Sequence, residues 1–136
     1  MTVFRSRGFD SIIGGQLVLS ANSVEIPANS TLLVEGTLSA HTIQQIASEK
    51  VASKTTLRVS GTIKKDSIGL NITVHNVIIT GKVECDEIRA EGCLAVKAGS
   101  TLKAGKIYYR ELIVETGAVM TGQMLHLDHV SEGEQT

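Results

Sequence analysis

Aliphatic and polar residues alternate along most of this chain, and the alternation recurs in similar units. Each unit starts with an aliphatic, a variable and an aliphatic residue, and a small residue follows two positions later in most units. The units begin at Leu17, Leu32, Leu57, Val77, Leu94 and Leu112. Period-two alternation is typical of half-buried β-strands. Its repetition every 15 to 25 residues is typical of a solenoid.

Stacking these units predicts columns of like residues inside the coil. The first column contains the six unit starts, and the second contains Leu19, Val34, Val59, Ile79, Val96 and Val114. A third column holds small residues, where the chain bends or another backbone comes close: Gly36, Gly61, Gly81, Ala98 and Thr116. We therefore predict an all-β, single-domain parallel β-helix (β-solenoid) of about six triangular rungs over residues 14–127.

Three segments fall outside the repeat. Residues 1–13 are expected to be a flexible N-terminal tail, and 128–136 a disordered C-terminal tail. Residues 41–56 form an irregular insertion, in which helical spacing of apolar residues predicts a short helix or a protruding loop. The N-terminal tail contains aromatic and basic residues that either fold over the end of the core or touch a membrane surface: Phe4, Arg5, Arg7 and Phe9.

Composition narrows the class of protein. Hydrophobic residues make up 42% of the chain but aromatic residues only 3%, which favours a narrow core of short aliphatic side chains. The formal net charge of -1 gives no electrostatic basis for binding nucleic acid. Neither a membrane-spanning apolar run nor a secretory signal is recognisable, so we expect a cytoplasmic protein. Cys85 and Cys93 lack metal-ligand spacing and are expected to be reduced and buried.

Candidate catalytic residues are few. His41 and His75 lie near predicted rung corners, where an acyltransferase of the hexapeptide-repeat type would place a general base. His126 and His129 are three residues apart, so on a strand they face opposite sides and make a poor metal pair. The sequence contains no phosphate-binding loop or nucleophile elbow. We expect no enzymatic activity, no cofactor and no metal.

The two ends of such a solenoid are predicted to self-associate. Monomeric repeat proteins need polar capping units, and exposed strand edges favour association. Here apolar sequence continues to within about ten residues of the C-terminus. Contacts that do not close under rotation produce filaments. The residues expected to border the stacking ends are Leu17, Leu19, Leu112, Val114, Val119 and Met120.

These repeats resemble the bactofilins, polymer-forming cytoskeletal proteins of bacteria. The resemblance covers about residues 14–127 and is most specific in the stretch YRELIVETGAVMTG at 109–122. It implies a right-handed triangular β-helix that assembles end to end into non-polar filaments without nucleotide. It also implies attachment to the inner membrane through a short N-terminal segment, and scaffolding of cell-wall or morphogenesis proteins.

Two other functions stay open at this stage. A hexapeptide-type acyltransferase would form a closed trimer and use His41 or His75 for turnover. A capped β-helical adaptor would instead use the insertion at 41–56 as its contact surface. Assembly beyond a trimer would favour the polymer-forming protein over the acyltransferase.

Overall fold

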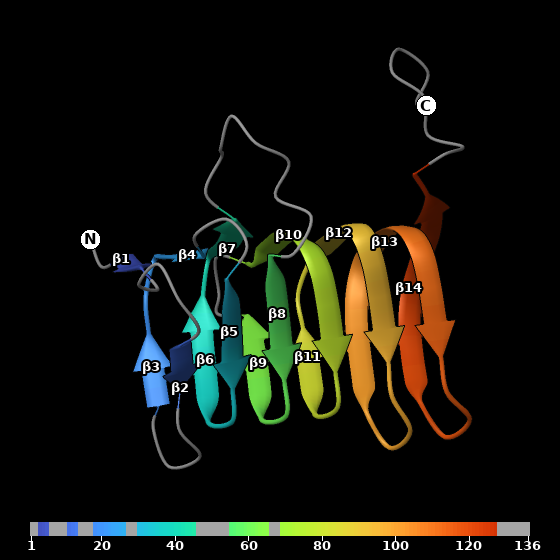
Figure 1. Ribbon diagram of the computed structural model, residues 1–136, viewed down its shortest axis with the longest axis horizontal. Helices are drawn as coiled ribbons and strands as arrows, with labels where there is room; N and C mark the ends of the chain where they lie inside the picture. The colour runs from blue at the N-terminus through green and yellow to red at the C-terminus, as the bar shows by residue number, and fades with distance from the viewer. Residues whose placement is uncertain are drawn as a thin grey trace.

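The computed structural model describes residues 3–5, 11–13, 18–26, 30–45, 55–65 and 69–127. In this part of the chain all regular secondary structure is β-strand, and the strands form one parallel sheet that coils into a solenoid. The coils stack side by side from the N-terminal to the C-terminal end (Figure 1). The predicted fold class, an all-β solenoid of stacked coils, is confirmed. The right hand of the coil stays a prediction.

Each coil contributes one strand or strand segment to each of three faces, which we call A, B and C. Face A contains β1 (Val3–Arg5), β4 (Ser23–Ile26), β7 (Thr42–Gln45) and parts of β10 (Asn71–Ile79), β12 (Glu87–Val96), β13 (Thr101–Val114) and β14 (Val119–His126). Face B contains β2 (Ser11–Ile13), β5 (Thr31–Val34), β8 (Thr56–Val59) and the C-terminal parts of β10, β12 and β13. Face C contains β3 (Val18–Ser20), β6 (Thr37–Ala40), β9 (Thr62–Lys65), β11 (Lys82–Glu84) and the N-terminal parts of β13 and β14.

The interior columns predicted from the repeat exist on face B. Leu32, Leu57, Val77 and Leu94 are direct register partners from coil to coil, and all four are fully buried. Val34, Val59, Ile79 and Val96 form the second column in the same way. Burying one such side chain contributes about 1.5–3 kcal/mol. Together with the buried residues of faces A and C, these aliphatic columns form the core of this aromatic-poor chain.

The small-residue column lies at the corner between faces B and C. The backbone nitrogens of Thr62, Lys82 and Thr101 donate hydrogen bonds of 2.9 Å to the carbonyls of Gly36, Gly61 and Gly81, respectively. A Cβ at Gly81 would overlap the carbonyl oxygen of Gly61 and lie 2.6 Å from that of Ser60. The sequence prediction of a close backbone approach in this column is confirmed at Gly61 and Gly81.

Substitution at this corner should destabilise the fold. Gly81→Ala is expected to lower the free energy of unfolding by about 1–3 kcal/mol, because backbone atoms of the preceding coil must move to admit the methyl group. Thermal or denaturant unfolding would measure the loss. Lys82→Ala, at the exposed neighbouring position, is the control and should be nearly neutral. Equal stability of the two variants would contradict the close approach.

The N-terminal end differs from the sequence prediction. Strands β1 and β2 lie within residues 1–13, the expected tail, and pair in parallel with β4 and β5. The first coil therefore begins before residue 14. Segments of three residues, without the full repeat signature, pair with the edge of the next coil and were too short to be recognised from sequence.

The register of the first repeat was also predicted wrongly. Leu19 was aligned with Val34, but it pairs with Leu38 on face C, and Ile13 is the register partner of Val34. The 15-residue spacing from Leu17 to Leu32 is shorter than one coil. The residues around Leu19 nevertheless alternate like the start of a unit, so they were aligned with the wrong strand. Leu17 lies outside the described residues.

The insertion predicted at 41–56 is partly regular. Its first part is strand β7, which pairs with β4 and β10 as an ordinary member of face A. The helix or loop predicted for the rest falls on residues 46–54, which lie outside the described residues. The predicted C-terminal tail, 128–136, also lies outside them, while β14 ends at His126.

Candidate assembly surface at the C-terminal coil

The last described coil, residues 111–127, has an edge that no described strand covers. The C-terminal part of β13 pairs with β12 only, and β14 pairs with β13 only. The strands at this end therefore present backbone amide and carbonyl groups that are not used in the sheet of the described residues. Such an edge can accept another strand.

Side chains that are buried in every inner coil become exposed here. Val59, Ile79 and Val96 are fully buried, but their register successor Val114 is 46% exposed. On the outer side of face B, where Leu33 and Ile78 are half-buried and Arg58 is exposed, Ile113 is 50% exposed. Val114 is exposed because no further coil lies over it in the described chain, whereas Ile113 adds an apolar side chain at an outward position.

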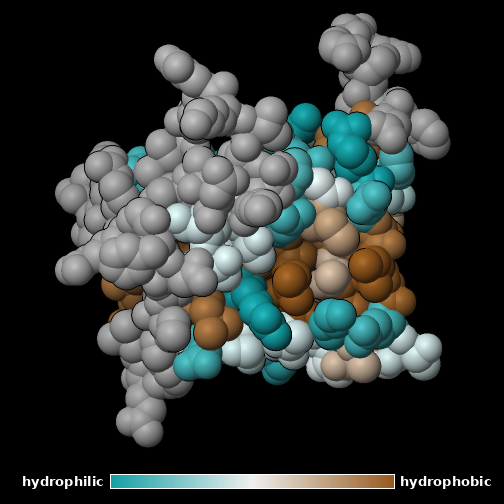
Figure 2. Space-filling view, viewed as in Figure 1, coloured by the Kyte–Doolittle hydropathy of each residue, from teal (hydrophilic) through white to brown (hydrophobic). Residues whose placement is uncertain are grey.

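Two other large hydrophobic residues of this coil are exposed. Val119 is 53% exposed and Met124 is 37% exposed. Leu112 and Met120 pack against the core but stay partly exposed. In Figure 2 hydrophobic atoms gather over the C-terminal coils, on the right of the view. We call this set of exposed apolar residues, 112–124, the C-terminal surface.

Charged groups are scarce on this surface. Residues 116–126 contain no Asp, Glu, Lys or Arg. Glu115 turns back to the preceding coil: it accepts a hydrogen bond of 2.9 Å from the backbone nitrogen of Ala98 and pairs with Lys97 at 3.3 Å. Both contacts lower the pKa of the Glu115 carboxyl, with the backbone hydrogen bond making the larger contribution. This carboxylate is therefore stabilised by its own subunit, which leaves the adjoining surface apolar.

The N-terminal end is less completely described. Leu19 on β3 is partly buried against the core, and Val18 beside it is 70% exposed. Phe4 and Arg5 are the register partners of Val24 and Glu25, so they belong to a strand of the first coil. Arg7 and Phe9 lie outside the described residues. Membrane contact by this segment stays a prediction.

The histidines considered as general bases are not brought together. His41 precedes strand β7 at one end of face A, and His75 follows Val74 at the other end, where it enters the bulge between faces A and B. His126 packs edge-on against Tyr109, with 5.1 Å between the ring centroids. His129 lies outside the described residues. In the described ranges no three side chains among His, Cys, Asp and Glu converge as metal ligands would.

Both cysteines are free thiols. Cys85 is buried in the core, where burial raises its pKa to about 12. Cys93 is only half-buried, so its predicted burial is incomplete. At the adjoining corner Asp86 pairs with Lys65 of the previous coil at 3.0 Å. This ion pair is the kind of charge compensation between neighbouring coils that a solvated face requires.

Sequence reasoning identified part of the C-terminal surface and missed part of it. Leu112, Val114, Val119 and Met120 were predicted end residues, and all lie in the last described coil. Ile113 and Met124 of this surface were missed, as was Val18 at the N-terminal end. Ile113 and Val18 occupy the variable outward position of the repeat, and only a count of apolar residues at that position could have identified them.

No helix in the described part of the chain is long and apolar enough to cross a bilayer. Comparison of the chain with protein-family models, with curated proteins and with solved structures found no significant match.

Proposed function

We propose that this protein is the subunit of a scaffold polymer in which β-solenoids stack end to end through their terminal coils. The observation that carries the proposal is the exposure of Val114 at a position where each inner coil buries its residue. Another copy placed over this edge would restore the burial and supply backbone partners for the open strands. Stacking of this kind leaves a new open end after each addition, so growth continues.

The resemblance to bactofilins supports a biological role for such a polymer. By analogy, the protein would be a cytoplasmic bacterial cytoskeletal scaffold that contributes to cell shape or to the placing of cell-wall and morphogenesis proteins. Attachment to the inner membrane through the N-terminal segment belongs to the same proposal. No nucleotide enters it, because the driving force is burial of apolar surface and strand pairing.

Assembly of the purified chain is the direct test. Without nucleotide, we expect filaments in negative-stain electron microscopy and a fast-sedimenting fraction in the ultracentrifuge. The filaments should persist at about 1 M salt, where the Debye length falls to about 3 Å and surface ion pairs are screened. A monodisperse monomer at high protein concentration would refute the proposal. A closed trimer that does not grow would favour the acyltransferase-like alternative.

A further inference from the structure

The outer side of face C carries a larger excess of positive charge than the other two faces. Its outward residues are Val18, Ser20, Thr37, Ser39, Thr62, Lys64, Lys82, Glu84, Thr101, Lys103, Val119 and Thr121. They include three lysines against one glutamate. Face A has one cation more than it has acids among its described residues: Glu25, Glu87 and Glu91 against Arg5, Arg89, Lys106 and Arg110. On face B, Glu111 is balanced by Arg58.

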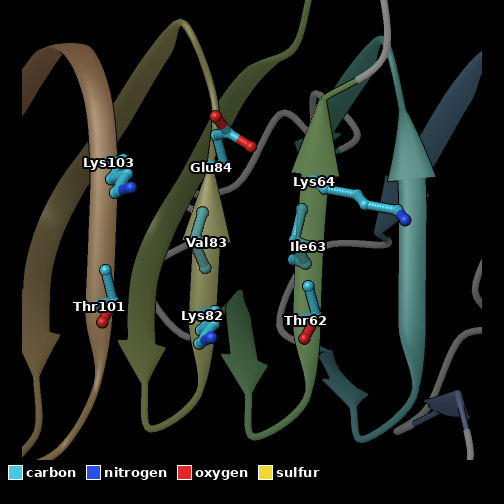
Figure 3. A pocket seen from close by; sticks show the side chains of 8 residues that line it. All are labelled: Thr62, Ile63, Lys64, Lys82, Val83, Glu84, Thr101 and Lys103. Carbon is cyan, nitrogen blue, oxygen red and sulfur yellow. The ribbon is translucent and has the colours of Figure 1, made fainter.

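The charged residues of face C line a shallow groove across β9, β11 and β13 (Figure 3). The volume of the groove is about 450 Å³. One row across it is Thr62, Lys82 and Thr101, which are direct register partners. In the second row Glu84 is the register partner of Lys103, and Lys64 is the outward residue on the next strand. An ammonium group thus comes from each of three successive coils.

Unlike Lys65 and Lys97, the three lysines of the groove have no anionic partner among the described residues. Lys65 pairs with Asp86, and Lys97 pairs with Glu115. Within the described residues, Lys64, Lys82 and Lys103 form no ion pair and no side-chain hydrogen bond. In Figure 3 the Lys64 side chain points away from Glu84, toward the neighbouring strand of face C. Lys82 and Lys103 therefore outweigh Glu84 in the groove, and Lys64 adds a further positive charge at its edge.

We propose that this groove binds the phosphate group of a phosphomonoester. Such a group carries about −1.5 to −2 charge at pH 7 and three strong acceptor oxygens, so it is attracted by the excess positive charge of the groove. Lysine binds phosphate as a point charge. The hydroxyls of Thr62 and Thr101, on either side of Lys82, can donate further hydrogen bonds to phosphate oxygens. Every contributing residue belongs to one subunit, so the site does not depend on assembly.

A phosphomonoester can reach the groove as a soluble metabolite or as a lipid headgroup. Equilibrium dialysis of the full chain against radiolabelled glycerol 3-phosphate tests the first source. Flotation with phosphatidylcholine vesicles, with and without phosphatidic acid, tests the second. Both measurements work whether or not the protein is polymerised. Binding of glycerol 3-phosphate identifies a soluble ligand, and binding of phosphatidic acid vesicles alone identifies the lipid as the source.

Substitutions in the groove should raise or lower the affinity for phosphate according to the charge that they remove. Lys82→Gln and Lys103→Gln should each weaken phosphate binding about fivefold, and Glu84→Gln should strengthen it by a similar factor. In water, the Coulomb energy between two unit charges a few ångströms apart corresponds to a change in affinity of about this size. Lys106→Gln, an exposed lysine on face A, is the matched control and should leave binding unchanged. All four positions face solvent, so folding is not at risk.

Several results would overturn the site. They are an absence of binding to both probes, an equal loss in Lys106→Gln, or no effect of Glu84→Gln. Equally tight binding of polyglutamate would show a general attraction for acidic polypeptides and would also refute a phosphate site. None of these results bears on polymer formation, which is measured separately by sedimentation.

Discussion

Leu94→Ala is expected to lower the free energy of unfolding by about 2–5 kcal/mol, the range for removing a large aliphatic side chain from a packed core. Leu94 is fully buried between Val77 of the preceding coil and Leu112 of the next. The narrow interior holds one such residue per coil at this position, and the backbones on both sides are fixed by strand pairing. The cavity can therefore collapse only partially, which places the loss in the upper part of the range.

Leu112→Ala is the matched control because it removes the same atoms from the same column at its last described position. Leu112 has a packed neighbour on one side only and is partly exposed. The loss of stability in Leu112→Ala should be well below that in Leu94→Ala when both variants are unfolded in denaturant at the same protein concentration, below the critical concentration for polymerisation. Equal losses would mean that Leu112 is as enclosed as Leu94, and would contradict the open end.

The interior columns could be predicted because alternation and the small-residue position together fix the register. A shift of one residue would turn every aliphatic side chain of the strand outward. Leu32, Leu57, Val77 and Leu94 obey this constraint, and the structure aligns them as predicted. At the N-terminal end the strands have three residues, and β3 is followed by no glycine at the usual position. Alternation alone does not distinguish Val34 from Leu38 as the register partner of Leu19.

The surface sites were harder to predict, because exposure depends on what lies over a residue and not on the residue itself. Val96 and Val114 have the same side chain and the same place in the repeat, yet one is buried and the other is exposed. The lysine groove was hard to predict for a different reason. Its three lysines lie on successive coils and are 18 and 21 residues apart in the sequence, so they form no local cluster of charge. The net charge of the chain, -1, does not indicate a basic surface either.

Val114→Asp is expected to abolish assembly while leaving the subunit folded. In the single subunit this position is 46% exposed, so the carboxylate reaches water and stays ionised. Once another coil covers it, the charge would be buried without a partner, which costs several kcal/mol. Each 1.4 kcal/mol changes an association constant tenfold. We therefore expect the critical concentration for polymerisation to rise by at least about two orders of magnitude, as measured by sedimentation.

Gln44→Asp separates the effect of the stacking position from the effect of charge itself. Gln44 is exposed on the outer side of face A in an inner coil, so this variant gains the same charge away from either end. It should polymerise like the unchanged protein. If both variants assembled normally, the C-terminal surface would not be the contact. If Val114→Asp lost its β-sheet signal in circular dichroism, Val114→Ser would replace it, since an uncharged polar side chain weakens the same contact with less risk to the fold. The prediction therefore depends on one asymmetry: Val114 tolerates a polar side chain while it is at an open end, and ceases to tolerate it when another coil closes over it.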